Sequence, residues 1–308
     1  MRLGADHVVV TVPATAGNLG SGFDSLGLAL GLTDEIEVRA VASASVELEI
    51  EGEGAETLPR DESHLVVRAL RAALDHVNAS QTGLAIRAIN RIPHGRGLGS
   101  SAAAVVAGIS AARGLIAEPE ALSAEVALEI ATQFEGHPDN AAPAIYGGAT
   151  VAWMAPGGAK AASVPVVDGI EAAVLIPGSV LPTEQARSVL PAMVPHRDAA
   201  FNVGRAALLV AALGGQPELL FEGTEDRLHQ TYRAEVMPSA MAMLDHLRAQ
   251  GLAAVVSGAG PSVLVLGTDL AARGLASGMP QWARGIGGEN WRVVHTVEQV
   301  PGATTHRL

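Results

Sequence analysis

The stretch Pro93–Ala103, PHGRGLGSSAA, decides the fold of this 308-residue chain. It places three alternating glycines and then two serines directly before a run of small, helix-forming residues. Glycine adopts backbone conformations that are closed to other residues and lets a ligand approach the main chain closely. The first N–H groups of a helix have no intrahelical partner, and they point toward an anion together with the positive end of the helix dipole. The stretch therefore predicts a loop that wraps around a phosphate at the start of a helix over 100–115.

Two other kinds of phosphate-binding loop do not fit this stretch. A Walker A loop requires a lysine after its second glycine, whereas Gly99 is followed directly by Ser100. A dinucleotide-binding loop requires G-x-G-x-x-G, and G-R-G-L-G is too compact. Tight packing of a strand-to-helix turn is the alternative explanation for the glycines alone. The paired serines favour a ligand site, because hydroxyls at a helix start can cap the helix and bind Mg²⁺.

The composition excludes several classes of function. A formal net charge of −12 without basic clusters argues against nucleic acid or an anionic membrane as a partner. Apolar runs stay short of the roughly 18–20 residues of a membrane span, and the first residues do not resemble a signal peptide, so we expect a cytoplasmic protein. The chain has no cysteine, which excludes disulfides and thiolate metal sites. Lys160 is the one lysine among 20 basic residues, so a mechanism that needs an active-site lysine is not expected.

The hydrophobic pattern predicts strands and helices in both halves of the chain. The expected strands are 7–12, 35–41, 46–50, 84–89, 149–153, 171–176, 253–256, 262–267 and 291–298. The expected helices are 63–77, 100–115, 119–133, 183–190, 199–213, 217–222, 237–250 and 269–277. Without regular βαβ alternation, this order favours an α+β fold over a doubly wound parallel sheet. Pro156–Gly158, followed by AKAAS, predicts a hinge that divides the chain into domains 1–156 and 157–308.

The pattern P-x-x-x-G-L-G-S-S-A-A resembles the phosphate loop of the GHMP kinases, which include galactokinase, homoserine kinase and mevalonate kinase. The match is unbroken through Pro93 and Gly97–Ala103. The resemblance implies a two-domain α+β fold, with a ribosomal-S5-like N-terminal domain that binds ATP and a ferredoxin-like C-terminal domain that contributes to the substrate site. It also implies ATP and Mg²⁺ as cofactors and phosphoryl transfer to a small-molecule hydroxyl. The residues implied to bind ATP are Pro93, His94, Gly95, Arg96, Gly97, Leu98, Gly99, Ser100, Ser101, Ala102 and Ala103.

A second motif, PATAGNLGSGFDSLGLAL from Pro13 to Leu30, resembles the homoserine kinase branch of that family. The resemblance implies that Asn18 and Asp24 contact an amino-acid substrate. The chemistry fits, because Asp24 can pair with an α-ammonium group while Asn18 donates and accepts hydrogen bonds. The alternative is that both residues only cap turns in a glycine-rich hairpin. Lysine-dependent relatives carry a lysine near this asparagine, and this chain has none there.

A third motif, EIATQFEGHPDNAAPAIYGG, begins at Glu129. The resemblance implies that Glu129 and Ser101 bind Mg²⁺, with Glu135 as the competing carboxylate. Mg²⁺ takes one or two protein oxygens besides phosphates and water, so this ligand set is adequate. The resemblance also places His137 and Asn140 at the substrate, although a histidine before proline can be an ordinary turn residue.

The substrate cations are expected from the C-terminal half. LPTEQARSVLP resembles a family segment that carries a threonine and an arginine at the substrate, here Thr183 and Arg187. DRLHQTYRAEVMP adds Arg233, and two arginine forks suit a carboxylate held through paired hydrogen bonds. A lone helical arginine is otherwise usually a solvated side chain. A glycine-rich turn in VVSGAGPSVLVL, 255–266, is expected to cover the site.

Asn140 and Arg187 are the implied catalytic residues. Because an amide is no base at pH 7, they imply catalysis by positioning and electrostatic stabilisation. In one departure from the family, His64 stands where an asparagine usually contributes to the adenine pocket; Ser63 could also simply cap the following helix.

Three functions follow as hypotheses. The first is ATP-dependent phosphorylation of the side-chain hydroxyl of L-homoserine, a step toward threonine. The second is phosphorylation of another small hydroxylated metabolite by the same fold. The third is a nucleotide sensor without turnover, against which the intact Ser101 and Glu129 argue. The family is often dimeric, so a homodimer is expected.

Overall fold

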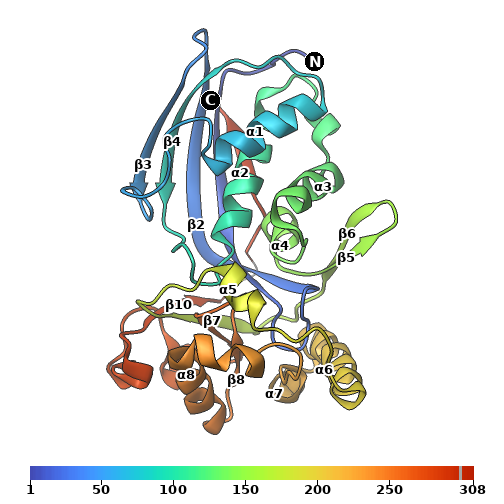
Figure 1. The fold of residues 1–308 in the computed structure, drawn as a ribbon, viewed down its shortest axis with the longest axis vertical. Coiled ribbons are helices and arrows are strands. Elements are labelled where there is room, and N and C mark those ends of the chain that lie inside the picture. The colour runs from blue at the N-terminus through green and yellow to red at the C-terminus, as the bar shows by residue number, and fades with distance from the viewer. Residues whose placement is uncertain (298–299) are drawn as a thin grey trace.

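The structure, a computed structural model, describes residues 1–297 and 300–308 (Figure 1). It consists of two parts stacked along the long axis, one around a seven-stranded sheet and one around a four-stranded sheet. Both ends of the chain lie in the part with the larger sheet. Helices and strands are mixed in both parts, and an α+β fold is therefore confirmed. Within the described part of the chain, no helix combines the length and the apolar character that crossing a bilayer requires.

The larger sheet is built on two long antiparallel strands, β1 (His7–Gly17) and β2 (Leu26–Val41). The side chains of Val8, Val10 and Val12 alternate into the core from β1, as the strand period of two requires. The sheet order is β11-β1-β2-β4-β3, with β3 (Val46–Gly52), β4 (Gly83–Asn90) and β11 (Thr304–Arg307). Helices cover one face of this sheet in Figure 1: α1 (Leu65–His76), α2 (Ser100–Leu115), α3 (Ala124–Glu135) and α4 (Ala141–Tyr146).

The predicted hinge at Pro156–Gly158 is wrong. It is the turn of a hairpin in which β5 (Ala149–Ala155) pairs with β6 (Gly158–Val164), and β5 also pairs with β2. The small residues of AKAAS sit in a strand because β5 supplies the hydrogen-bonding partner, which a local pattern does not reveal. We therefore propose to move the domain boundary to the loop at 165–170, with β11 returning to the first sheet.

The smaller sheet has the order β10-β7-β9-β8, and all its neighbouring strands are antiparallel. Its strands are β7 (Glu171–Ile176), β8 (Ala253–Val256), β9 (Val263–Gly267) and β10 (Arg292–Thr296). Numbered along the chain, this is the order 4-1-3-2 of a ferredoxin-like βαββαβ unit. Its helices are α5 (Thr183–Ser188), α6 (His196–Gly215), α7 (Leu220–Gly223) and α8 (Pro238–Ala249).

Several predicted elements have different limits in the structure. The helix predicted over 119–133 is a 3₁₀ turn, Pro119–Leu122, followed by α3, whose first turn is capped by the Ser123 hydroxyl accepting from Val126 N at 3.4 Å. The helix predicted over 269–277 is one short irregular turn at Ala271–Leu275. The predicted strand 291–298 is β10, and its residue 298 lies outside the described residues. The first half of β2, together with α4, β6 and β11, was not predicted.

Candidate active site

The glycine loop has the backbone that its sequence predicts. Gly95, Gly97 and Gly99 have φ angles of +64°, +67° and +65°, in the left-handed region that favours glycine. A Cβ atom at Gly97 would overlap the carbonyl oxygen of Ser257, which shows how closely another backbone approaches the loop. Helix α2 begins at Ser100 as predicted, but its N-cap is Gly99 and no side chain caps it. The serine hydroxyls are therefore not used as caps.

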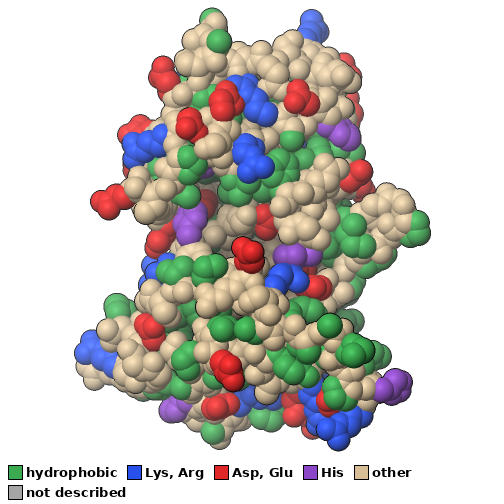
Figure 2. Space-filling view, viewed as in Figure 1, with side chains coloured by type: hydrophobic (Ala, Val, Ile, Leu, Met, Phe, Trp, Pro, Cys, Tyr) green, Lys and Arg blue, Asp and Glu red, His purple; other side chains and the backbone are tan. Residues whose placement is uncertain are grey.

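A cavity of about 280 Å³ lies between the two parts of the molecule, where Figure 2 shows a hollow at the waist with charged and histidine side chains around it. Twelve of the predicted site residues line it: Asn18, Gly95, Gly97, Leu98, Gly99, Ser100, Ser101, His137, Asn140, Thr183, Arg187 and Arg233. Six others do not line it: Pro93, Arg96, Ala102, Ala103, Asp24 and Glu129. His94 lines a second, adjoining cavity. The structure thus brings most of the predicted residues, from five distant segments, to one place.

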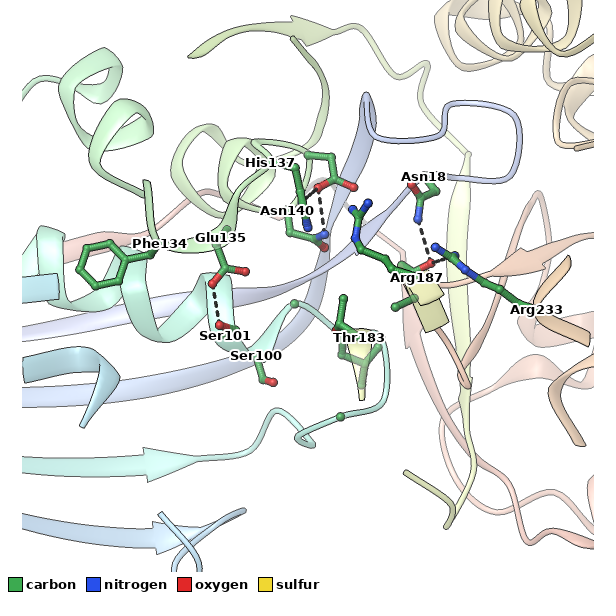
Figure 3. Close-up of a pocket in the computed structure, with 17 residues that line it drawn as sticks. Asn18, Ser100, Ser101, Phe134, Glu135, His137, Asn140, Thr183, Arg187 and Arg233 are labelled. Atoms are coloured by element: carbon green, nitrogen blue, oxygen red, sulfur yellow. Dashed lines mark hydrogen bonds and ion pairs between the residues drawn. The ribbon is translucent and has the colours of Figure 1, made fainter. Parts of the chain in front are cut away.

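The carboxylate beside the phosphate loop is Glu135, and the prediction of Glu129 is corrected. The Ser101 hydroxyl donates to Glu135 Oε1 at 2.5 Å (Figure 3), whereas Glu129 is exposed and lies beside Gly158 of the hairpin. Six residues along a helix correspond to about 240° of rotation, so the two carboxylates cannot share a face. Glu135 lies on the buried face with Leu128 and Ala131, at the i, i+3, i+7 spacing that the sequence already contained.

One carboxylate and one hydroxyl fit Mg²⁺, which needs few protein oxygens when phosphates and water complete its shell. In keeping with so small a donor set, no group of three or more histidine or acidic side chains that could hold a metal occurs among the described residues. Burial raises the pKa of Glu135. A cation beside this side chain would oppose that effect, because it favours the charged form.

The loop between α3 and α4 holds a chain of polar side chains in the centre of the cavity (Figure 3). Asp139 is 1% exposed and accepts from His137 Nδ1 at 2.5 Å and from Asn140 Nδ2 at 3.2 Å. The hydrogen bond to Asp139 raises the pKa of His137. The Asn140 oxygen in turn accepts from the Thr15 hydroxyl at 3.0 Å. Asp139, which was not among the predicted site residues, is thus engaged in orienting His137 and Asn140.

Asp24 and Arg187 form an ion pair with each other. Arg187 donates from its two terminal nitrogens to the two carboxylate oxygens of Asp24 at 2.7 and 3.3 Å. Their side chains are 37% and 35% exposed, so the pair remains open to solvent and to a ligand. The predicted partners of a substrate ammonium and a substrate carboxylate are therefore adjacent.

Arg233 is held more firmly, since it is 1% exposed. It donates to the carbonyl oxygens of Ala186 and Gly258, both at 3.1 Å, and to His229 Nδ1 at 3.0 Å. Burial, and then the nearby Arg187, lower the pKa of Arg233 to about 10. His229, which the sequence analysis did not single out, is fully buried and is neutral, because its Nδ1 accepts from Arg233 while its Nε2 donates to Gly20 O at 2.9 Å. Burial lowers the pKa of His229, which agrees with this tautomer.

Asn18 links two of the glycine-rich turns. Its amide nitrogen donates to Gly258 O at 2.8 Å, and its amide oxygen accepts from Asp24 N at 2.9 Å. Asn18 and Asp24 both have positive φ angles, +70° and +53°. The Asn18 side chain therefore caps a turn, as the alternative interpretation predicts, and Asp24 lies in this turn. The turn at 257–260 covers the phosphate loop as expected, because the Ser257 hydroxyl donates to Gly97 O at 2.7 Å.

A second cavity, of about 350 Å³, adjoins the first and shares Gly95, Ser100 and Ser101 with it. Its walls are mostly apolar, and besides the two shared serines its polar residues are Asp34, Ser63, His64, Arg68, Asn90 and His94. His64 itself is the N-cap of α1, since its Nδ1 accepts from Val66 N at 3.3 Å, so Ser63 is not the cap. Burial lowers the pKa of both His64 and His94. A largely apolar pocket with a few polar groups suits a nucleotide base.

The buried carboxyl of Asp34 was not found from the sequence. It is 6% exposed and accepts from Arg91 N at 2.5 Å and Ile92 N at 2.9 Å. Burial raises its pKa from the ordinary value of 3.8 to about 6, against the lowering effect of these two hydrogen bonds. Folding therefore favours the protonated form of this group.

We expect Asp34→Asn to change how stability depends on pH. A raised pKa in the folded state gives stability that is present below pH 3.8 and is lost as the pH rises through about 6. The difference between the two pKa values corresponds to roughly 3 kcal/mol, which the wild type should lose relative to Asp34→Asn between about pH 4 and pH 7. Urea unfolding of both proteins across this range measures it. Two parallel curves would show that Asp34 titrates normally.

Comparisons with known proteins agree with this geometry. Residues 64–148 match the family description "GHMP kinases N terminal domain", and residues 206–283 match "GHMP kinases C terminal". A homoserine kinase of Streptomyces avermitilis is 52% identical over 288 residues, which are 93% of this chain and 92% of that protein. A homoserine kinase of Leifsonia xyli is 46% identical and covers 99% of this chain and 94% of its own length.

The solved structures point the same way. A crystal structure of homoserine kinase from Cytophaga hutchinsonii has a TM-score of 0.84 at 25% identity, covering 98% of both chains. The phosphate loop and the polar loop between α3 and α4 fall within the first of the two matched family regions, whereas the second cavity is also lined by residues that precede this region, among them Val12 and Asp34.

Proposed function

Because this chain belongs to the homoserine kinases of the GHMP kinase family, we propose that it transfers the γ-phosphoryl group of ATP to the side-chain hydroxyl of L-homoserine. The products are ADP and O-phospho-L-homoserine. The same relatives confirm the predicted two-domain α+β fold, with a ribosomal-S5-like N-terminal part and a ferredoxin-like C-terminal part. The observation that carries the proposal is that a base-sized cavity and a charged cavity meet at Ser100 and Ser101.

This arrangement supports one placement of ATP. The base would occupy the cavity lined by His64 and His94, and the phosphates would follow the glycine loop toward the charged cavity. Backbone N–H groups of the loop and the N-terminus of α2 would bind the phosphates, because both present positive charge to an anion. Lys160, the one lysine, is exposed in β6 and lines neither cavity. The loop and the helix must therefore supply attraction that a lysine provides elsewhere.

Ser101 and Glu135 are the residues that would hold Mg²⁺. The ion, when bound with ATP, supplies charge that neutralises the phosphate oxygens during transfer. The protein contributes a carboxylate fixed on the last turn of α3 and a hydroxyl fixed on the first turn of α2.

The charged cavity suits a zwitterionic amino acid. Asp24 would accept from the α-ammonium and Arg187 would donate to the α-carboxylate, so that the substrate would replace the direct pair between them. Arg233 lies behind this site, and Thr183 and His137 line the same cavity. An isoprenoid phosphate would need more free cations than this cavity offers.

The protein groups near the substrate hydroxyl favour catalysis by positioning. Asn140 cannot remove a proton at pH 7, and the buried Asp139 is engaged with His137 and Asn140. A loose phosphoryl-transfer transition state needs little proton removal before the transfer. A well-aimed hydrogen-bond donor to developing charge can lower the barrier by about 3–4 kcal/mol. We assign Asn140 and Arg187 to this role, while a cytoplasmic location, a homodimer and the lack of nucleic-acid or membrane partners stay predictions.

A coupled assay for ADP release tests the proposal. Purified protein with ATP and Mg²⁺ should release ADP with L-homoserine and much more slowly with serine, mevalonate or galactose. Turnover on another alcohol but not on homoserine would refute the assignment of homoserine as the substrate, while the assignment to the GHMP kinase family would stand. Nucleotide binding with no turnover on any of the four would favour the sensor hypothesis, against which the intact Ser101–Glu135 pair argues.

A further inference from the structure

Arg96 lies inside the phosphate loop but does not line the cavity that the loop forms. Its side chain is used on main-chain carbonyls instead. The Nε atom donates to Pro177 O at 3.1 Å, and one terminal nitrogen donates to Gly178 O at 2.9 Å. The other terminal nitrogen donates back to His94 O at 3.2 Å. The prediction that Arg96 binds ATP is therefore not supported by its position, and its guanidinium joins the loop to the segment after β7.

That segment, residues 177–182, is called the strap here, and it touches the loop at a second point. Leu181 N donates to Gly95 O at 2.8 Å, and a Cβ atom at Gly95 would lie 2.5 Å from Val180 Cγ1. The far side of the strap is fixed as well, because Gly178 N donates to Glu289 Oε2 at 3.0 Å. Arg96 and Gly95 thus hold the strap over the loop at both of its ends.

The strap leads directly into the substrate residues. Helix α5 begins at Thr183, and Arg187 follows one turn later. Both line the charged cavity, on the side opposite Glu135 in Figure 3. A shift of the strap would move Thr183 and Arg187 together, since both lie in the short helix that directly follows it. Misplacement by about 1 Å can lower the rate about 100-fold in a site that works by orientation.

We propose that Arg96 is a positioning residue that couples the nucleotide loop to the homoserine site through the strap. The inference rests on the proposed function, because it assigns Thr183 and Arg187 to homoserine. A loop held in place by bound phosphates fixes Gly95 and Arg96, and these fix the strap and the start of α5. Bound nucleotide should therefore tighten homoserine binding, and homoserine should tighten nucleotide binding by the same factor.

Arg96→Met tests this coupling, because methionine keeps much of the length and removes every donor. The Kd of L-homoserine is measured by calorimetry with and without saturating ADP and Mg²⁺. In the wild type, ADP should lower this Kd, and in Arg96→Met the effect should disappear. The variant's KM for homoserine should rise about tenfold, while the Kd of ADP measured alone changes less than about threefold, because the lost hydrogen bonds do not reach the phosphates.

Two further variants separate positioning from folding and from charge. Arg91→Met removes an exposed guanidinium five residues earlier on the same segment and should behave as wild type. Arg96→Lys keeps the positive charge and one donor nitrogen, so it should recover part of the coupling between nucleotide and homoserine binding. Thermal unfolding of each variant shows whether it is folded. If Arg96→Met is misfolded, the effect of ADP on the Kd of homoserine is measured in Arg96→Lys instead.

The possible results are distinct. Wild-type coupling that persists unchanged in Arg96→Met, or a wild type that binds homoserine equally well with and without ADP, would overturn the inference and leave the proposed function intact. Weaker ADP binding with normal homoserine binding in Arg96→Met would show that Arg96 is a phosphate ligand, as the sequence suggested. A wild type that binds no homoserine would instead overturn the proposed function, and the inference with it.

Discussion

Glu135→Gln should lower kcat on the order of 10³-fold while leaving the protein folded. The carboxylate is the acidic side chain that meets Ser101 at the helix start, and glutamine keeps its shape while losing its charge. The fold should tolerate the change, because burial already raises the pKa of Glu135 and thus disfavours its charged form. The measurement is kcat from the ADP-release assay over a range of Mg²⁺ concentrations, with the unfolding midpoint as the check on folding.

Glu129→Gln is the matched control, since it makes the same change on the same helix. Its carboxylate is exposed next to Gly158 and should contribute nothing to the rate. The two variants decide between the sequence prediction and the geometry of the structure. A large loss of kcat in Glu129→Gln with normal activity in Glu135→Gln would reverse the assignment.

The parts of the site that depend on local backbone were predictable from the sequence. The glycine loop and the start of α2 depend on a few adjacent residues whose positive φ angles only glycine adopts readily. The assignment of Glu129 rested on a resemblance and not on helix phase. Helix phase favours Glu135, because it places this residue on the stripe with Leu128 and Ala131.

Other parts could not be predicted, because their partners are far away in sequence. Asn18 donates to the carbonyl oxygen of Gly258, which lies 240 residues later, and Arg96 donates to carbonyl oxygens more than 80 residues away. Both were assigned to ligands because they stand in ligand-binding motifs. The hairpin of β5 and β6 resembled a hinge for a related reason, since its strand character depends on pairing with β2.

The second large effect that we expect is on substrate binding. It also depends on a contact between distant segments, the ion pair of Asp24 and Arg187. Asp24→Asn should raise the KM for L-homoserine by about 30- to 100-fold, because it removes the negative partner of the α-ammonium. Asparagine is the right replacement, since Asp24 has a φ angle of +53° and asparagine tolerates the left-handed region. The Kd of ADP should remain as in the wild type.

Asp198→Asn is the matched control for this variant. Asp198 also pairs with an arginine, Arg227, at 3.3 Å, but this arginine, unlike Arg187, does not line the charged cavity. Its loss should leave the KM for homoserine unchanged, because the pair lies outside the cavity that is proposed to hold homoserine. If Asp24→Asn instead bound homoserine normally and lost kcat alone, Asp24 would act on the transition state through Arg187 and would not recognise the ammonium.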